Sequence, residues 1–184
     1  MFPVYPGDVI AVRGTGRFSD LIVRATGGYV SHVGMVIADE PPLVTEALFR
    51  VKTRPLEESI ADCSDAWILR PRFATAYTRR VLMHSIHTYS SAGYGYFKIL
   101  LHGLDALCRT QWFSCTFARS HSPICSWLVA SAYEAVGYSF GESIGSLTPQ
   151  DLVNHCTANP KKWEILRLKG NTCPQAATTE YITY

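Results

Sequence analysis

The chain has 184 residues, of which 47% are apolar and 17% are charged, and its formal net charge is +2. These values are typical of a globular protein of one domain, and so small a net charge does not indicate a nucleic-acid partner. No apolar run reaches the roughly 18 residues of a membrane span. The start, "MFPVYPGDV", lacks the basic and apolar regions of a signal peptide, so we expect a cytoplasmic location unless another route exports the protein.

The first 72 residues are predicted to be mostly β-strands. A short helix is expected over 18–28, where Gly27 and Gly28 end the pattern. The sequence "DEPP" at 39–42 is typical of a turn, so the strands on either side should pair as antiparallel neighbours. Alternating or β-branched runs predict strands over 7–13, 32–38, 43–49, 50–56 and 66–72.

Helices dominate the second half of the chain. A pair of start signals is clear: Ser122 is a candidate N-cap before Pro123, and Thr148 precedes Pro149 in the same way. In the second case Asp151 follows three residues after the cap, as in a capping box. The predicted helices span 76–93, 96–108, 122–137, where Gly137 ends the pattern, and 148–155, and a last strand spans 163–168.

This order of elements predicts an α+β fold, with a small, mainly antiparallel sheet followed by segregated helices. We expect one domain over residues 1–170. Residues 171–184 contain no Lys or Arg and are rich in Thr and Ala, which favours a mobile C-terminal tail.

The six cysteines form no CxxC pair and no Cys/His spacing typical of zinc, so the sequence implies no metal and no other cofactor. Five of them are interpreted as small apolar residues or incidental thiols. These are Cys63, Cys108, Cys115, Cys156 and Cys173.

Cys125 differs because it falls in the first turn of the helix that Ser122 is expected to cap. Unpaired N–H groups and the helix dipole stabilise a thiolate there, which is the nucleophilic form of cysteine. The alternative is a buried structural cysteine, since Cys125 shares a helical face with Val129 and Ala132. The helical periodicity alone is compatible with a nucleophilic and with a structural Cys125.

A catalytic thiolate needs a base, and His32 at the start of a predicted strand is the first candidate. A histidine in a strand is more often structural, and His121 is the main rival because it lies next to the cap of the Cys125 helix. The other candidates are His84, His87, His102 and His155.

Glu46 is the candidate that orients the base. It is a carboxylate within the otherwise apolar run "LVTEALF", although alternation also permits it to face solvent. We predict that Glu46 and His32 lie across neighbouring strands within hydrogen-bonding distance. If Glu46 lies on the other face, Asp151, Asn154 or a backbone carbonyl takes its place.

The order "GDVIAVRG…FSDLI…SHVGMV…LVTEAL…PICSWLVASAYEAVG", from about Gly7 to Gly137, resembles the circularly permuted NlpC/P60 group of papain-like proteins, specifically its YiiX/YebB-like branch. In that group the histidine precedes the polar residue and the cysteine, as His32, Glu46 and Cys125 do here. "YGYF" at 94–97 also resembles a family segment and suggests Tyr94 as an oxyanion or substrate-pocket residue. Ile124 departs from the aromatic residue common before the Cys-Ser pair, and residues 107–121 match no family segment.

The resemblance implies a cysteine hydrolase of the peptidase or amidase type, with Cys125 as nucleophile, His32 as base and Glu46 as orienting group. Its substrate would be a peptide or a peptidoglycan-type amide, cleaved without a cofactor, and the N–H of Cys125 would stabilise the oxyanion. An alternative is a thioesterase, lipid acyl hydrolase or acyltransferase on the same fold, with the aromatic residues from Trp112 to Phe117 near an acyl chain. A non-enzymatic binding module is a further alternative.

Overall fold

The computed structural model describes residues 3–47, 51–90, 125–141, 143–171 and 174. Its centre is a six-stranded sheet in the order β4-β3-β2-β1-β5-β6, in which every neighbouring pair is antiparallel. The strands are β1 (Val9–Gly14), β2 (His32–Asp39), β3 (Pro42–Ala47), β4 (Val51–Pro55), β5 (Cys63–Pro71) and β6 (Trp163–Lys169). The predicted α+β class and the antiparallel pairing are confirmed.

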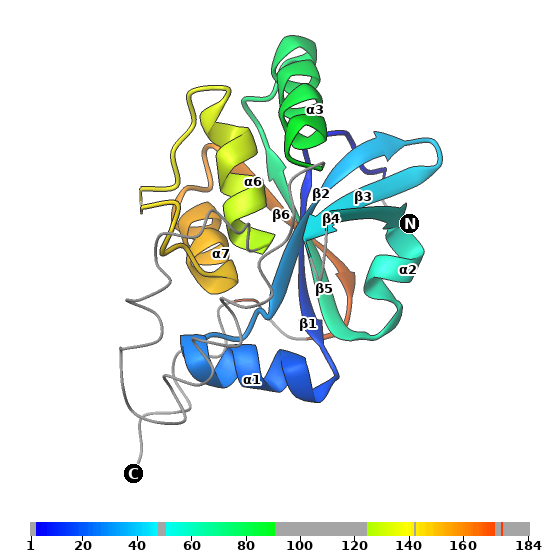
Figure 1. The fold of residues 1–184 in the computed structure, drawn as a ribbon, viewed down its shortest axis with the longest axis vertical. Coiled ribbons are helices and arrows are strands. Elements are labelled where there is room, and N and C mark those ends of the chain that lie inside the picture. Colours follow the sequence, from blue (N-terminus) through cyan, green and yellow to red (C-terminus); the bar gives the residue numbers. More distant parts are fainter. Residues whose placement is uncertain (1–2, 48–50, 91–124, 142, 172–173, 175–184) are drawn as a thin grey trace.

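Helices cover both faces of the sheet (Figure 1). The larger core lies between the sheet and α3, α6 and α7, and a smaller core lies between the opposite face and α2. The helices are α1 (Arg17–Thr26), α2 (Leu56–Ala61), α3 (Ala76–Ser90), α6 (Cys125–Glu134) and α7 (Pro149–Ala158). None of the helices in the described residues has the length and apolar character needed to cross a bilayer.

Strand alternation explains the two cores. Along β1, Val9 and Ala11 contact the larger core, whereas Ile10 and Val12 contact the smaller one. A strand buried on both faces has no polar side, which is why its sequence is nearly continuously apolar. The central position of β1, between β2 and β5, follows from this double burial.

Local signals in the sequence set several helix ends. Thr148 and Asp151 form the predicted capping box at the start of α7: the Thr148 side chain accepts a hydrogen bond from the N–H of Asp151, and the Asp151 carboxylate accepts one from the N–H of Thr148. Gly27 ends α1 in the left-handed conformation, with φ of 64°. Both of these predictions are confirmed.

One predicted element differs in the structure. The strand expected over 50–56 ends at Pro55, and Leu56 begins α2, which the sequence did not predict. Pro55 serves as the N-cap and Glu57 and Glu58 occupy the first turn, where acidic residues are favourable. The helix expected over 96–108 and the cap residues Ser122 and Pro123 lie outside the described residues.

Candidate active site

Cys125 is the first residue of α6, and this helix packs on β2 and against α3. Its side chain is 5% exposed and belongs to the larger core together with Val129 and Ala132. Cys125 therefore packs in the core as a structural cysteine would, yet its thiol also lines a cavity beside His32. Burial alone does not decide between the two interpretations, so the partners of the thiol must.

His32 begins β2, where its ring reaches both Cys125 and the neighbouring strand. Its Nε2 lies 2.7 Å from Oε2 of Glu46, which confirms the predicted contact. Because an ionised carboxylate only accepts hydrogen bonds, Nε2 must be the donor. Nδ1 is then the ring nitrogen that remains for Cys125, which lines the same cavity and interacts electrostatically with His32.

Glu46 is fully buried on β3, and its carboxylate has three side-chain partners. Oε2 accepts from His32, while Oε1 accepts from Nε of Arg54 and from the Ser59 hydroxyl at 2.9 Å. Sequence reasoning missed Arg54 and Ser59, although Arg54 pairs with Val44 in the register of β3 and β4 and therefore shares the face of Glu46. A buried carboxylate stays ionised at low cost only with partners of this kind.

The charges of the three groups support one another. Burial alone lowers the pKa of His32, but the charges and hydrogen bonds of Cys125 and Glu46 raise it to about 10. Burial raises the pKa of Glu46, whereas the hydrogen bonds and charges of His32 and Arg54 lower it to about 2. Burial also raises the pKa of the Cys125 thiol, but His32 and backbone hydrogen bonds from Val33 and Ser126 bring it below the ordinary value.

The other two cysteine thiols in the described residues behave differently. Cys63 and Cys156 are buried free thiols, and burial raises the pKa of each. Cys125 is thus the described cysteine whose surroundings favour the thiolate, which makes its reactivity distinguishable from that of the other two.

The glycine at position 34 leaves space on the sheet for the side chain of Glu46, which binds His32. Gly34 lies directly opposite Glu46 in the register of β2 and β3. A Cβ at this position would lie 2.9 Å from Cγ1 of Val44 and 3.1 Å from Cβ of Glu46. An alanine here therefore requires the side chain of Val44, and to a smaller degree that of Glu46, to shift.

We therefore expect Gly34→Ala to lower the free energy of unfolding by about 1–3 kcal/mol, the range for overpacked sites. Thermal unfolding measures this. Gly145→Ala is the matched control, because nothing lies within 4 Å of the Cβ position there and its unfolding should change little. Equal stability of the two variants would contradict the close packing at Gly34.

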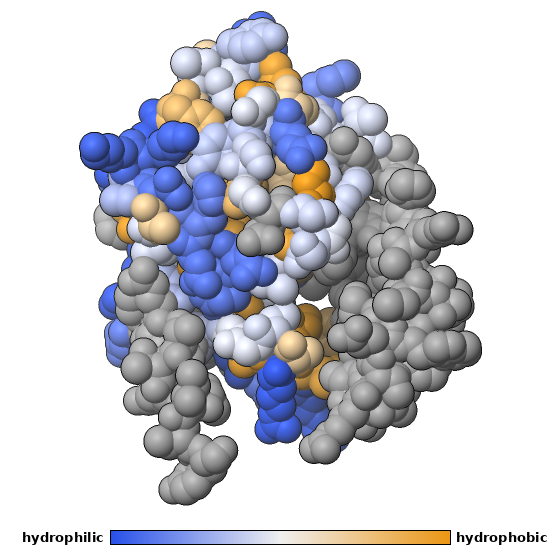
Figure 2. Space-filling view, turned by 90° about the vertical axis from the view of Figure 1, so that its left-hand side faces the viewer, coloured by the Kyte–Doolittle hydropathy of each residue, from blue (hydrophilic) through white to orange (hydrophobic). Residues whose placement is uncertain are grey.

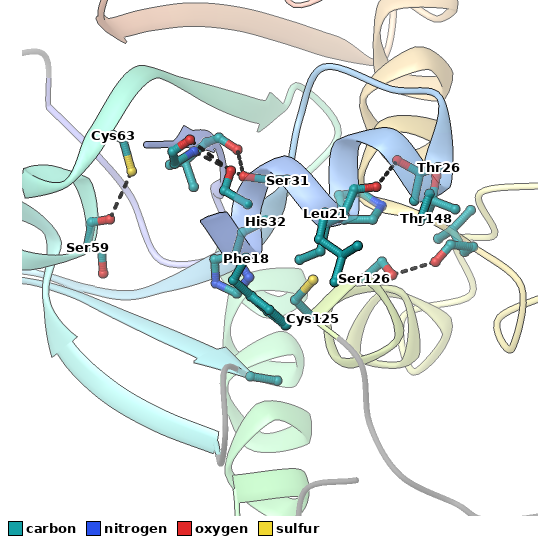
Figure 3. A pocket seen from close by; sticks show the side chains of 18 of the residues that line it. Phe18, Leu21, Thr26, Ser31, His32, Ser59, Cys63, Cys125, Ser126 and Thr148 are labelled. Carbon is teal, nitrogen blue, oxygen red and sulfur yellow. Dashed lines mark hydrogen bonds between the residues drawn. The ribbon is translucent and has the colours of Figure 1, made fainter. Parts of the chain in front are cut away.

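A cavity of about 700 Å³ opens in front of Cys125. One wall is α1, whose residues are all at least partly exposed and whose apolar side chains Phe18, Leu21, Ile22 and Ala25 line the cavity. In Figure 3, Phe18 and Leu21 lie near Cys125 and His32 around this space. Figure 2 shows a mainly hydrophilic face, with apolar residues visible in a hollow in its lower half.

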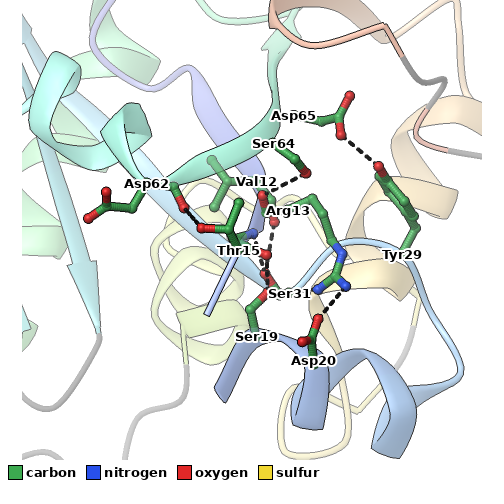
Figure 4. Close-up of polar contacts among 11 residues, drawn as sticks. Val12, Arg13, Thr15, Ser19, Asp20, Tyr29, Ser31, Asp62, Ser64 and Asp65 are labelled. Carbon is green, nitrogen blue, oxygen red and sulfur yellow. Dashed lines mark hydrogen bonds and ion pairs between the residues drawn. The ribbon is translucent and has the colours of Figure 1, made fainter. Parts of the chain in front are cut away.

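Polar contacts hold α1 to the end of β1 (Figure 4). Arg13 donates to the Ser19 hydroxyl at 2.8 Å and to the Asp20 carboxylate at 2.6 Å. Ser19 in turn donates to the carbonyl of Gly14, and the Ser31 hydroxyl accepts from the N–H of Gly14. This wall of the cavity is thus attached by hydrogen bonds rather than by a buried apolar face.

The alternative histidines and orienting groups are placed elsewhere. His84 and His87 are exposed on α3, and Nε2 of His155 lies 2.8 Å from the Tyr138 hydroxyl. Asp151 serves in the capping box of α7 and Asn154 accepts from Gln150. Tyr94, His102, His121 and residues 107–121 lie outside the described residues, so their predicted roles stay predictions.

Cys125 and His32 therefore line one cavity of an α+β fold, and Glu46 binds His32 from the neighbouring strand. A scan against protein-family models and a search of curated proteins found no match. Among solved structures, the chain is similar to YiiX from Escherichia coli O157:H7, with a TM-score of 0.59 and 23% sequence identity over 77% of this chain and 71% of YiiX. The predicted YiiX-like fold is confirmed, while the relation to NlpC/P60 proteins stays a prediction.

YiiX is described as a metalloprotein, but the described side chains around Cys125 do not fit a metal ion. In the part of the chain that the structure describes, no group of three or more His, Cys, Asp or Glu side chains is arranged to hold one. Both oxygens of Glu46 already accept hydrogen bonds, and the positive charge of Arg54 beside them opposes a cation.

The low pKa of Glu46 makes stability depend on pH in acid. Because its folded pKa is about 2 and its ordinary value is 4.5, ionised Glu46 stabilises the fold above pH 4.5, and this contribution is lost as the pH falls toward 2. We expect the difference in free energy of unfolding between wild type and Glu46→Gln to shrink by about 2–3 kcal/mol over that interval. Urea unfolding at each pH measures it.

Glu57→Gln serves as the control for this series, since Glu57 is an exposed glutamate on α2. Its difference from wild type should stay near zero throughout. If the Glu46→Gln difference did not change with pH, Glu46 would not be held ionised by its partners.

Proposed function

We propose that this protein is a cysteine hydrolase that cleaves an amide bond, with a peptide or peptidoglycan-type substrate. Cys125 is the nucleophile, His32 the general base and acid, and Glu46 the group that orients His32. The observation that carries the proposal is the arrangement of the three residues: the Cys125 thiol and His32 line one cavity, and Nε2 of His32 lies 2.7 Å from the carboxylate of the buried Glu46. A structural cysteine needs neither partner.

The first half of the reaction forms an acyl-enzyme. The Cys125 thiolate attacks the substrate carbonyl carbon, a C–S bond forms, and the carbonyl electron pair moves to oxygen. The backbone N–H of Cys125, at the first turn of α6, stabilises this oxyanion. His32 then gives the proton on Nδ1 to the leaving amine as the C–N bond breaks, leaving a thioester and neutral imidazole.

The second half regenerates the enzyme. Neutral His32 takes a proton from water, and the resulting hydroxide attacks the thioester carbon. The C–S bond breaks, so the product carboxylic acid leaves and the thiolate and imidazolium are restored. Glu46 stays ionised throughout and holds the imidazole by Nε2, in the way the third member of a catalytic triad acts.

The alternative substrate is an acyl ester or thioester, and one observation favours it. The wall that faces Cys125 is formed by apolar side chains of α1, with Phe18 and Leu21 each more than a third exposed. An exposed apolar surface of this kind is suited to an apolar ligand. The chemistry at Cys125 is the same for both substrate types, because each has a carbonyl carbon and a leaving group.

A substrate panel tests the proposal. Wild type and Cys125→Ala are compared on peptide amides, muropeptide fragments, and p-nitrophenyl esters and acyl thioesters of increasing chain length. We expect hydrolysis by wild type alone, with the highest kcat/KM on an amide. A higher kcat/KM on long-chain esters or thioesters would show that the substrate is an acyl ester or thioester and not an amide. Equal rates of hydrolysis by wild type and Cys125→Ala on every probe would contradict the hydrolase and favour a non-enzymatic binding module.

A further inference from the structure

Arg54 is a charged residue of the site that the mechanism above does not use. It lies on β4, two strands away from His32, and its Nε donates to the Glu46 oxygen that does not bind His32. Its side chain is 31% exposed and lines the cavity, whereas Glu46 is fully buried. The guanidinium thus reaches from the cavity wall to the back of the buried carboxylate.

The charge of this carboxylate becomes critical during turnover. When His32 is an imidazolium, Glu46 has a cation on each side, His32 at Oε2 and Arg54 at Oε1. When His32 has given its proton to the leaving group, the imidazole is neutral and Arg54 is the one cation still bonded to Glu46 among the described residues. A buried carboxylate without a cation takes up a proton readily.

We propose that Arg54 is a positioning residue of the active site: it keeps Glu46 ionised and directed at His32, so that the proton needed by the leaving group stays on the imidazole. Ser59 assists as a neutral donor to the same oxygen. This inference rests on the proposed cysteine-hydrolase function. It extends the catalytic series to Cys125, His32, Glu46 and Arg54, in which negative and positive charges alternate.

Other charged groups surround this series and must be counted in any pH dependence. On β4, Lys52 pairs with Glu46 in register and is exposed. From α2 and the residues after it, Glu58 and Asp62 line the same cavity. Cys63 at the start of β5 is influenced by Glu46 and Arg54, and by Lys169 of β6. None of these residues is replaced in the variants below, and because Glu46 and Arg54 act on Cys63, the labelling of Cys125 is measured separately from that of Cys63.

The experiment measures the rate at which iodoacetamide alkylates Cys125 as a function of pH, with site mapping by mass spectrometry. The proteins are wild type, Arg54→Met, Glu46→Gln and the double variant, and Arg72→Met is the control because Arg72 is exposed and pairs with Glu164. Loss of Arg54 raises the pKa of Glu46, so its protonation weakens the imidazolium–thiolate pair at a higher pH. We expect the acid limb of the profile to move up by about one pH unit, which is about a tenfold slower reaction on that limb.

The double variant identifies how Arg54 acts. If it acts through Glu46, Arg54→Met should have little further effect in the Glu46→Gln protein, and Arg72→Met should have none. An unchanged acid limb in Arg54→Met, or an equal displacement with and without Glu46, would overturn the inference. Arg54→Gln, which keeps a hydrogen-bond donor without the charge, decides the question in the same way if Arg54→Met does not fold.

Failure of the proposed function gives a different result when His32→Ala is added to the same experiment. Wild-type Cys125 would then show no acid-side reactivity and no dependence on His32. A wild type with a reactive, His32-dependent Cys125 but no effect of Arg54 would overturn the role of Arg54 alone.

Discussion

Replacing Cys125 by serine is expected to lower kcat by about 10⁵–10⁶-fold on whichever amide or ester wild type hydrolyses, a loss like that of other triad nucleophiles. Serine keeps the shape of the side chain but is not ionised by His32. The fold should survive, because the hydroxyl is surrounded by His32 and by the N–H groups of Val33 and Ser126 that now bind the sulfur. The melting temperature should therefore change by only about 2–4 °C, equivalent to about 1 kcal/mol.

The structural interpretation of Cys125 makes the opposite forecast. A hydroxyl without partners in the core costs about 1–3 kcal/mol, so Cys125→Ser would melt well below wild type. Remaining activity would then follow the folded fraction of the protein. Thermal melts and initial rates measured on the same samples separate the two.

His32→Ala should cause a loss of similar size, about 10⁵–10⁶-fold in kcat, because no other described group can take the proton of the thiol. Glu46→Gln should cost less, about 10⁴-fold, since the imidazole remains but is no longer held in the required tautomer. Steady-state rates on the best substrate of the panel measure both. The ranking follows from the order of the series, in which His32 interacts with the nucleophile directly and Glu46 reaches it through His32.

His84→Ala is the matched control, because His84 is an exposed histidine on α3 outside the cavity. It should retain wild-type activity. Equal rates for His32→Ala and His84→Ala would remove His32 from the mechanism. A larger loss in Glu46→Gln than in His32→Ala, with both proteins folded, would contradict the assigned order.

Much of the fold is predictable because its signals are local. The capping box of Thr148 and Asp151 requires residues three apart, and the turn between β2 and β3 requires a short run of turn formers. The contact between His32 and Glu46 is predictable for a related reason. A tight turn pairs their two strands, and a polar side chain within an apolar strand is expected to bind a polar side chain of the strand beside it.

The parts that the sequence did not predict depend on non-local contacts. Arg54 and Ser59 look like ordinary surface residues, and only the register of β4 with β3 and the position of α2 bring them to Glu46. Helix α2 itself has six residues, too short for a periodic pattern. The helical pattern of α1 predicts a helix but not that its apolar side chains line a cavity instead of a core.

The proposed reaction depends on a Cys125 thiolate paired with the His32 imidazolium. Its most direct test is mass-spectrometric mapping of iodoacetamide-labelled cysteines in the native protein across pH, in wild type and His32→Ala. We expect Cys125 to react before Cys63 and Cys156 at mildly acidic pH, and to lose this lead in His32→Ala, because its pKa is lowered while burial raises theirs. Labelling of Cys125 only after unfolding, at a rate independent of His32, would contradict the nucleophile and the hydrolase function that depends on it.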